Sequence, residues 1–447
     1  ALPLAWLSFC TLTPWVEGTI DATILGTAAG FPVVFAGLYA VLWKLPEARQ
    51  KKGFLLLGIF SNLAVLGFFK YFNFFGDSLL GLLGAVGIDP GWTLPHVILP
   101  IAISFYTFQS MAYSVDVYRG RATPCQSWLT FSAYLAYFPQ LVAGPIERAN
   151  HLMPQFLQSV RWDWSHVHFG LRLLLVGAFK KVFVADNCAI LANYAFDPAT
   201  ELNAPWAILG ALAFAFQIYG DFSGYTDLAR GSARLMGIEL SENFHLPYSA
   251  RGPSDFWQRW HMTLSSWFRD YVYIPLGGNR RGSARTIFNL WVTMLLAGLW
   301  HGAAWTFVLW GAFHAALLTL YRVVRPLGDL ESDEGASRGK RALGVAVMFS
   351  FTLVGWAIFR AADLPSLIAW FKALGNWEPV LDWVKPSFWL LLHAGPLLLL
   401  QWGTGRQKDE AQMSHFPWGL RGFVYWLMFM LVAGSVSSDQ EFIYFQF

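Results

Sequence analysis

"TIFNLWVTMLLAGLWHGAAWTFVLWGAFHAALLTLY" spans residues 286–321 and contains no Asp, Glu, Lys or Arg. As one straight helix, these 36 residues would be about 54 Å long, whereas the hydrocarbon core of a bilayer is about 30 Å thick. The segment must therefore break, tilt steeply or turn back. Gly298 and Gly302 mark the expected break, which places His301 at a bend at membrane depth. Broken helices are tolerated there where they are buried in protein or line a cavity.

The composition of the whole chain is that of a membrane protein. Its 447 residues are 55% hydrophobic and 13% charged, with a mean hydropathy of +0.42, whereas soluble domains carry about 25% charged residues. The net charge of +3 gives no reason to expect nucleic-acid binding. The three cysteines show neither the spacing of a metal site nor a disulfide framework, and we expect no bound metal.

Further uncharged runs locate other membrane spans. They predict an all-α polytopic membrane protein with about 10–12 transmembrane helices plus re-entrant or interfacial helices. The clear runs are residues 22–43, 53–69, 91–115, 126–146, 202–220, 342–359, 386–405 and 422–438. Residues 1–16 and 166–185 are weaker candidates, since the second run contains Arg172, Lys180 and Lys181.

The longest polar stretch inside the body covers residues 244–285 and has six Arg against two Asp. This excess of positive charge predicts a cytoplasmic location. The stretch is also rich in Trp and Phe, so it should lie on the bilayer or dip into it. A helix should begin near Pro253 with Asp255 as its cap. One face of that helix would carry Trp257, His261, Leu264 and Phe268.

Three histidines are candidates for chemistry. His301 is either a buried histidine bonded to a helix carbonyl or a general base, because histidine titrates near neutral pH. His261 lies 40 residues earlier, and the two imidazoles could meet around a reacting hydroxyl. His314 is expected to be a packing residue.

Two acidic residues, Asp221 and Asp227, follow an apolar span. They either form ion pairs with Arg230 or Arg251, or they orient a donor.

Four long motifs resemble those of the bacterial membrane-bound O-acyltransferases. They are "FPQLVAGPIER" (138–148), "DFSGYTDLARG" (221–231), "NFHLPY" (243–248) with "FWQRWHMTLSSWFRDYVYIPLGGNRRG" (256–282), and "LAGLWHGAAWTFVLWGAFHA" (296–315). The resemblance is dense over residues 137–320 and extends to residues 69–75, 99–120 and 442–447. The alginate O-acetylation branch of the family is the most similar.

The resemblance implies a fold and a site. The fold would be a single membrane domain over residues 1–447, in which helices form a ring around a thinned centre with a tunnel. Its parts would be N-terminal spans (1–136), a catalytic core (137–320) and C-terminal spans (321–447). The family's near-invariant histidine falls on His301, and a second functional position falls on His261. The residues expected to contact donor or substrate are Arg259, Arg269, Asp270, Asn279, Arg280, Arg281, Asp221, Ser223 and Trp300.

The implied activity is acyl transfer across the bacterial cytoplasmic (inner) membrane to modify an exported or cell-surface polysaccharide. Acetyl-CoA would be the acyl donor. It is anionic and cytoplasmic, and the arginines of the basic stretch would bind its phosphates well. No prosthetic group would be needed. An extracytoplasmic partner of the serine-hydrolase type would act on the other side. The polymer stays open between alginate, cellulose and peptidoglycan. Alternatives are D-alanyl transfer to teichoic acids, a transporter without chemistry of its own, and a scaffold for polymer export.

Overall fold

The computed structural model describes residues 34, 36–89, 91, 96–160, 163–325, 331, 337–377, 383–405 and 413–435. Within these residues the regular structure is entirely helical. Four of their helical stretches are long and apolar enough to cross a membrane, namely Glu47–Ala85, Ala204–Leu235, Trp305–Val324 and Arg338–Arg360. The prediction of an all-α polytopic membrane protein is confirmed, and the total number of transmembrane helices stays a prediction. The weak span at 1–16, most of the run at 22–43 and the terminal motif at 442–447 lie outside the described residues.

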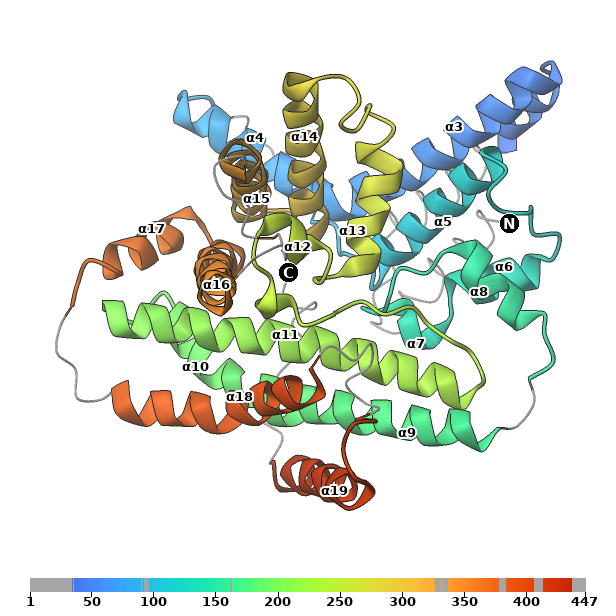
Figure 1. Ribbon diagram of the computed structural model, residues 1–447. Helices are drawn as coiled ribbons and strands as arrows, with labels where there is room; N and C mark the ends of the chain where they lie inside the picture. The colour runs from blue at the N-terminus through green and yellow to red at the C-terminus, as the bar shows by residue number, and fades with distance from the viewer. Residues whose placement is uncertain are drawn as a thin grey trace. The chain divides into compact units, whose positions relative to one another are not determined.

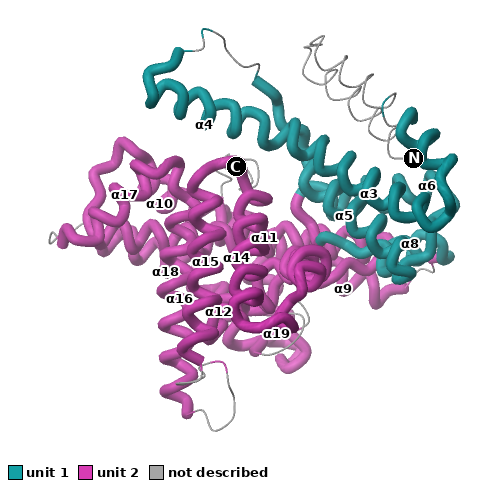
Figure 2. The backbone as a smooth tube through the Cα atoms, turned by 90° about the horizontal axis from the view of Figure 1, so that it is seen from above, with its two compact units in different colours: residues 1–142, 146–159 teal, residues 143–145, 160–447 magenta. Residues whose placement is uncertain are grey.

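The chain divides into two compact units, which Figure 2 colours separately. The first comprises residues 1–142 and 146–159, and the second comprises residues 143–145 and 160–447. The single domain and its three predicted parts stay predictions.

The first unit is built from helices, and the longest helical stretch among its described residues is Glu47–Ala85. Its elements are α3 (Glu47–Leu66), the π-helical η1 (Gly67–Tyr71), α4 (Phe72–Ala85), α5 (Ile103–Tyr118), α6 (Trp128–Leu135), α7 (Phe138–Leu141) and α8 (Ala149–Phe156). The amide of Asn62 on α3 donates to Ser110 Oγ on α5 at 3.3 Å. Two predicted spans are wrong in their bounds. In the run at 91–115, the described residues 96–102 are not helical, and α5 begins at Ile103 after Ala102, which has a positive φ of 65°. The run at 126–146 divides into two short helices, α6 and α7.

In the second unit, a long buried helix packs along two others. α9 (Trp164–Ala178), the π-helical η2 (Phe179–Ala185) and α10 (Asp186–Phe196) precede α11 (Ala204–Leu235). The backbones of α9 and α11 approach closely at glycines, since a Cβ on Gly177 would lie 2.7 Å from the Gly224 carbonyl oxygen and one on Gly170 would lie 2.9 Å from that of Gly231. Small residues at such crossings are the usual means of close helix packing in membranes. The weak candidate at 166–185 is therefore helical, and it packs against a buried helix.

The charge-free segment at residues 286–321 forms most of a helical hairpin. α14 (Ser283–His301) and α15 (Trp305–Val324) lie side by side, joined by residues 302–304 (Figure 1). Their contact depends on glycines, because a Cβ on Gly298 would overlap the carbonyl oxygen of Phe307 and a Cβ on Gly311 would overlap that of Met294. The predicted break near Gly298–Gly302 is confirmed, and the segment turns back.

The predicted helix after Pro253 is interrupted at His261. α12 (Pro253–Trp257) ends early, and α13 (Met262–Phe268) begins after His261, whose φ of 42° is left-handed. The segment before η3 (Pro247–Ser249) causes the interruption: the His245 N–H donates to the Arg259 carbonyl, and the Met262 N–H donates to the Asn243 carbonyl, both at 2.9 Å. The prediction that Trp257, His261, Leu264 and Phe268 share one face of a single helix is therefore wrong.

The predicted cap is also wrong, because Gly252 occupies the N-cap position of α12 and Asp255 lies in its first turn. The remaining elements are the π-helical η4 (Arg269–Tyr273), α16 (Arg338–Arg360), α17 (Leu364–Ala373), α18 (Val384–Thr404) and α19 (Trp418–Gly434).

Candidate active site around His301

His301 is the last residue of α14 and is held among aromatic rings. Its side chain is nearly buried, with 8% of the residue exposed. The ring centroids of Trp300, Trp310 and Phe359 lie 5.1, 5.0 and 5.3 Å from that of its imidazole. Gly302 allows this close turn, because a Cβ there would overlap the Phe307 ring. The hairpin therefore fixes the position of the imidazole with little freedom to move.

A cavity of about 200 Å³ adjoins His301. Its wall is contributed by α12, α13, η4, α14 and α15, all in the second unit. The polar side chains of the wall, besides His301 itself, are Ser254, Ser265, Arg269, Tyr273 and Thr293. The cavity is thus lined both by His301 and by residues of the basic stretch 244–285. An opening toward the opposite face stays a prediction.

His261 is completely buried, with 0% of the residue exposed. Its Nδ1 lies 3.0 Å from the side-chain oxygen of Asn243, and the centroid of the Phe222 ring lies 4.7 Å from its own. Burial lowers the pKa of His261 to about 3, because a low-dielectric surrounding disfavours the charged imidazolium. The imidazole is therefore neutral near pH 7.

Both candidate histidines lie beside the indole ring of Trp300. The Trp300 centroid lies 5.9 Å from that of His261 and 5.1 Å from that of His301, so the two imidazoles are at most about 11 Å apart. That they meet around a reacting hydroxyl stays a prediction. Trp305, at the start of α15, is more than half exposed. His314 is buried, with ring centroids 5.0 Å from Trp257 and 4.6 Å from Trp310, as expected of a packing residue.

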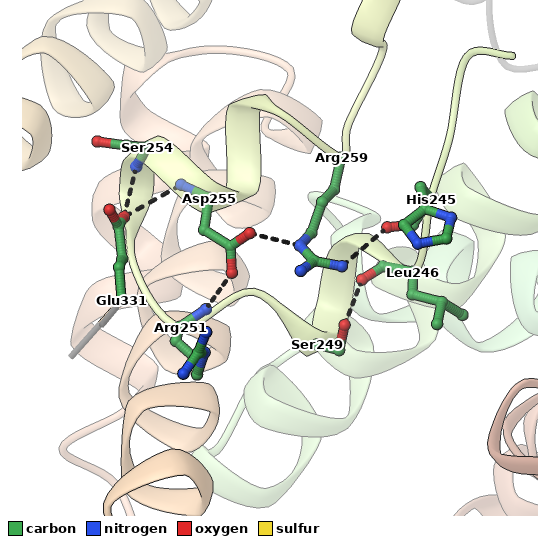
Figure 3. Close-up of polar contacts among 8 residues, drawn as sticks. All are labelled: His245, Leu246, Ser249, Arg251, Ser254, Asp255, Arg259 and Glu331. Carbon is green, nitrogen blue, oxygen red and sulfur yellow. Dashed lines mark hydrogen bonds and ion pairs between the residues drawn. The ribbon is translucent and has the colours of Figure 1, made fainter. Parts of the chain in front are cut away.

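Arg259, predicted to contact the donor, is part of a local polar network (Figure 3). Its Nε pairs with Oδ1 of Asp255, and a terminal nitrogen donates to the His245 carbonyl at 3.5 Å. The other oxygen of Asp255 accepts the Arg251 N–H at 3.1 Å. Glu331 accepts the N–H groups of Ser254 and Asp255, both at 3.0 Å. The carboxylate of Asp255 is therefore the ion-pair partner of Arg259 in this network.

The other basic candidates lie nearer to solvent. The side chain of Arg269 is 62% exposed, bonds through Nε to Asp270 at 2.8 Å, and also lines the cavity. Asn279, Arg280 and Arg281 are exposed in the turn before α14. That turn needs glycine, because Gly278 has a φ of +56°. Of the predicted donor-contacting residues, Arg269 is thus the one that shares a cavity with His301.

The acidic candidates on α11 are buried in ion pairs. Asp221 pairs with Lys181 at 2.8 Å, and Asp227 pairs with Lys180 at 2.8 Å and with Arg230 at 3.7 Å. The predicted pairing of Asp227 with Arg230 is confirmed, whereas the partner of Asp221 was not foreseen. In the sequence, these two lysines indicate only a weaker membrane span. Ser223, on the same helix, is buried.

Sequence reasoning also missed Asn243, because no rule of spacing links it to His261 across a loop. Its place in the motif "NFHLPY" was the only signal available. Among the described residues, no group of three or more His, Cys, Asp or Glu could hold a metal ion.

Comparisons with known proteins show which family the chain belongs to. Residues 125–359 match the model of the membrane-bound O-acyltransferase family. The chain is 43% identical over 327 residues to the probable alginate O-acetylase AlgI of Azotobacter vinelandii, an alignment that covers 72% of this chain and 62% of that protein. It is 37% identical over 365 residues to the peptidoglycan O-acetyltransferase of Helicobacter pylori, covering 75% of this chain and 68% of that protein.

A more distant relative is the teichoic acid D-alanyltransferase of Bacillus subtilis, which is 27% identical over 281 residues, covering 59% of this chain and 70% of that protein. The chain spans less than two thirds of the length of the Azotobacter relative. Because the family match extends over more than half of its residues, the chain belongs to the membrane-bound O-acyltransferase family.

Proposed function

We propose that the protein is an O-acyltransferase that passes acetyl groups from cytoplasmic acetyl-CoA across the bacterial inner membrane, for O-acetylation of an exported or cell-surface polysaccharide. The observation that carries the proposal is the cavity beside His301, which is also lined by Arg269 of the basic stretch. An acyl donor with phosphates at one end and a thioester at the other has a suitable site there. Arginine binds the phosphates well, and the imidazole is near the thioester.

His301 serves as the general base in the proposed step. It takes the proton of an acceptor hydroxyl while the hydroxyl oxygen bonds to the thioester carbonyl carbon. The carbon–sulfur bond then breaks, and the thiolate takes the proton from His301, so that the products are an O-ester and a free thiol. A base acts within about 2.6–3.2 Å of the proton it accepts, or through one water. The fixed position of His301 among Trp300, Trp310 and Phe359 favours such a geometry.

The membrane separates the donor from the final acceptor in this proposal. Acetyl-CoA stays on the cytoplasmic side with the basic stretch, and only the acetyl group crosses. An extracytoplasmic partner of the serine-hydrolase type would complete the transfer to the polymer. No metal or prosthetic group takes part.

The relatives favour acetyl over D-alanyl transfer. The O-acetylating relatives are 37–43% identical to this chain, whereas the D-alanyltransferases are 25–27% identical. Their names leave the polymer open between alginate and peptidoglycan, and cellulose is a third candidate.

The experiment compares polymer labelling in cells that express the wild-type chain, His301→Ala or a matched control, His168→Ala. His168 is an exposed residue of α9. We expect label from acetate in the polymer with the wild-type chain and the control, and a loss of about 10²–10⁴-fold with His301→Ala, the range for removal of a general base. Full labelling with His301→Ala at equal membrane levels would favour a scaffold or transporter. Incorporation of labelled D-alanine in place of acetate would favour the teichoic acid branch.

A further inference from the structure

The side chain of Asn243 determines which nitrogen of His261 carries the proton. One atom of the Asn243 amide accepts the Thr263 N–H at 3.2 Å and the Thr263 hydroxyl at 2.9 Å. A backbone N–H can only donate, so this atom is the amide oxygen and not the nitrogen. The same oxygen lies 3.0 Å from Nδ1 of His261. An amide oxygen only accepts, so Nδ1 must be the nitrogen that bears hydrogen.

The other nitrogen of His261 then has a lone pair. A neutral imidazole with hydrogen on Nδ1 is an acceptor at Nε2. Nε2 is buried and has no hydrogen-bond partner among the described residues. The rings around it belong to Phe222, Phe244 and Trp300, with centroids 4.7, 6.3 and 5.9 Å away. An unpaired acceptor in such a place is costly, and a ligand with a donor group would remove that cost.

The backbone holds Asn243 in place independently of its side chain. The Met262 N–H donates to the Asn243 carbonyl at 2.9 Å, directly beside the left-handed His261. Two contacts between the same two segments, one from the backbone and one from the amide, fix both the position and the tautomer of the imidazole. A neutral amide is also suited to this role, because a carboxylate in its place would favour the imidazolium.

We propose that Asn243 is a positioning residue that holds His261 in the Nδ1–H tautomer, so that Nε2 accepts a hydrogen bond from a donor group of the acyl acceptor other than the reacting hydroxyl, whose proton goes to His301. The part that concerns the acceptor rests on the proposed function. His261 and His301 then have different tasks, and both lie beside the Trp300 ring. His301 adjoins the cavity of the donor, and His261 orients the acceptor by accepting its hydrogen bond.

The first test is the tautomer of the wild-type chain. The full-length protein, labelled with ¹⁵N-histidine and reconstituted in lipid nanodiscs, is measured by NMR without substrate. The His261 signals are identified by their loss in His261→Gln. We expect a protonated Nδ1 and an unprotonated Nε2 near pH 7. Hydrogen on Nε2, or an imidazolium, would overturn the proposal whether or not the protein transfers acetyl groups.

The second test separates the amide oxygen from the shape of the side chain. Asn243→Leu keeps a similar volume without an acceptor, Asn243→Asp keeps an acceptor oxygen, and Asn62→Leu is the control at a buried asparagine of the first unit. We expect Asn243→Leu to lose the Nδ1–H preference and to lower acetyl transfer by about 10²–10⁴-fold, as an incorrect tautomer does elsewhere. Asn243→Asp should retain hydrogen on Nδ1.

Two outcomes of the second test would overturn the role of Asn243. One is an unchanged tautomer in Asn243→Leu, and the other is a lost tautomer with undiminished transfer. A failure of the proposed function has a different signature: the wild-type chain would show the expected tautomer and transfer no acetyl group. If Asn243→Leu does not insert in the membrane, the wild-type measurement decides the tautomer by itself.

Discussion

Gly298→Ala is a sharp test of how the hairpin positions His301. The added Cβ would overlap the Phe307 carbonyl oxygen and lie 3.2 Å from Cα and N of Gly311. These are backbone atoms, so no side chain can rotate away, and α14 and α15 must separate by on the order of 1 Å. Overpacking lowers the free energy of unfolding by about 1–3 kcal/mol. The better helix propensity of alanine offsets about 0.5–1 kcal/mol of this loss.

The effect on activity should exceed the effect on stability. His301 is three residues from Gly298, near the turn of the hairpin, so separation of the helices displaces the imidazole. A displacement of about 1 Å can lower a rate by about 10²-fold. We therefore expect Gly298→Ala to lower acetyl transfer by about 10–10²-fold with a net loss of about 1–2 kcal/mol in the free energy of unfolding.

The assay measures acetyl transfer per amount of membrane-inserted protein, together with thermal unfolding in nanodiscs. Gly84→Ala on α4 is the matched control, because a Cβ there has no neighbour within 4 Å. The control should retain full activity. If Gly298→Ala also retains both its activity and its unfolding temperature, the close approach of α14 and α15 does not position His301.

Three further predictions concern charged and titratable groups. Lys180→Met should destabilise the protein by about 1–3 kcal/mol, because the buried Asp227 loses its partner at 2.8 Å and keeps the longer pair with Arg230 at 3.7 Å, and Lys180→Met with Asp227→Leu should recover much of this loss in thermal unfolding. Arg269→Glu should weaken the apparent affinity for acetyl-CoA more than Arg280→Glu does, because Arg269 lines the cavity, and equal affinities in a titration would contradict its role. Burial lowers the pKa of His261 to about 3, whereas the unfolded chain binds a proton there at its ordinary pKa of about 6.5. The free energy of unfolding is therefore unaffected by this group above pH 6.5 and falls by about 1.4 kcal/mol per pH unit below it. His261→Gln should therefore lose less stability than the wild-type chain between pH 6.5 and 4.5, as followed by unfolding temperature.

The hairpin could be predicted from the sequence because it follows from length and charge alone. A charge-free run of 36 residues is too long for one crossing, and glycines on both sides of Trp300 and His301 leave one obvious place for the turn. The same reasoning identified His301 as a functional candidate, because an ionisable residue at membrane depth is costly.

The environment of His261 could not be predicted in the same way. Its amphipathic pattern indicates one helix through residue 261, and the structure interrupts that helix. The cause is a contact with residues 243–245, which are distant in sequence and carry no periodic signal. The position of Trp300 beside both imidazoles likewise depends on how α14 packs against other elements.

Buried charges were a second difficulty. Lys180 and Lys181 lower the apolarity of residues 166–185 and so weaken the prediction of a span. In the folded protein they lie in η2 and neutralise Asp227 and Asp221 on α11. A hydropathy pattern records a charged residue but not its ion-pair partner. A buried segment whose charges are paired therefore has the same hydropathy as a segment outside the membrane.

In the proposed function, His301 is the base for the transfer of an acetyl group from cytoplasmic acetyl-CoA. The most direct measurement uses inverted membrane vesicles that contain the full-length chain and its extracytoplasmic partner, with [¹⁴C]acetyl-CoA supplied outside. We predict that labelled acetyl groups accumulate on acceptors inside the vesicles with the wild-type chain and are reduced to background with His301→Gln at equal protein levels. Equal accumulation with His301→Gln, or none with the wild-type chain, would contradict the account.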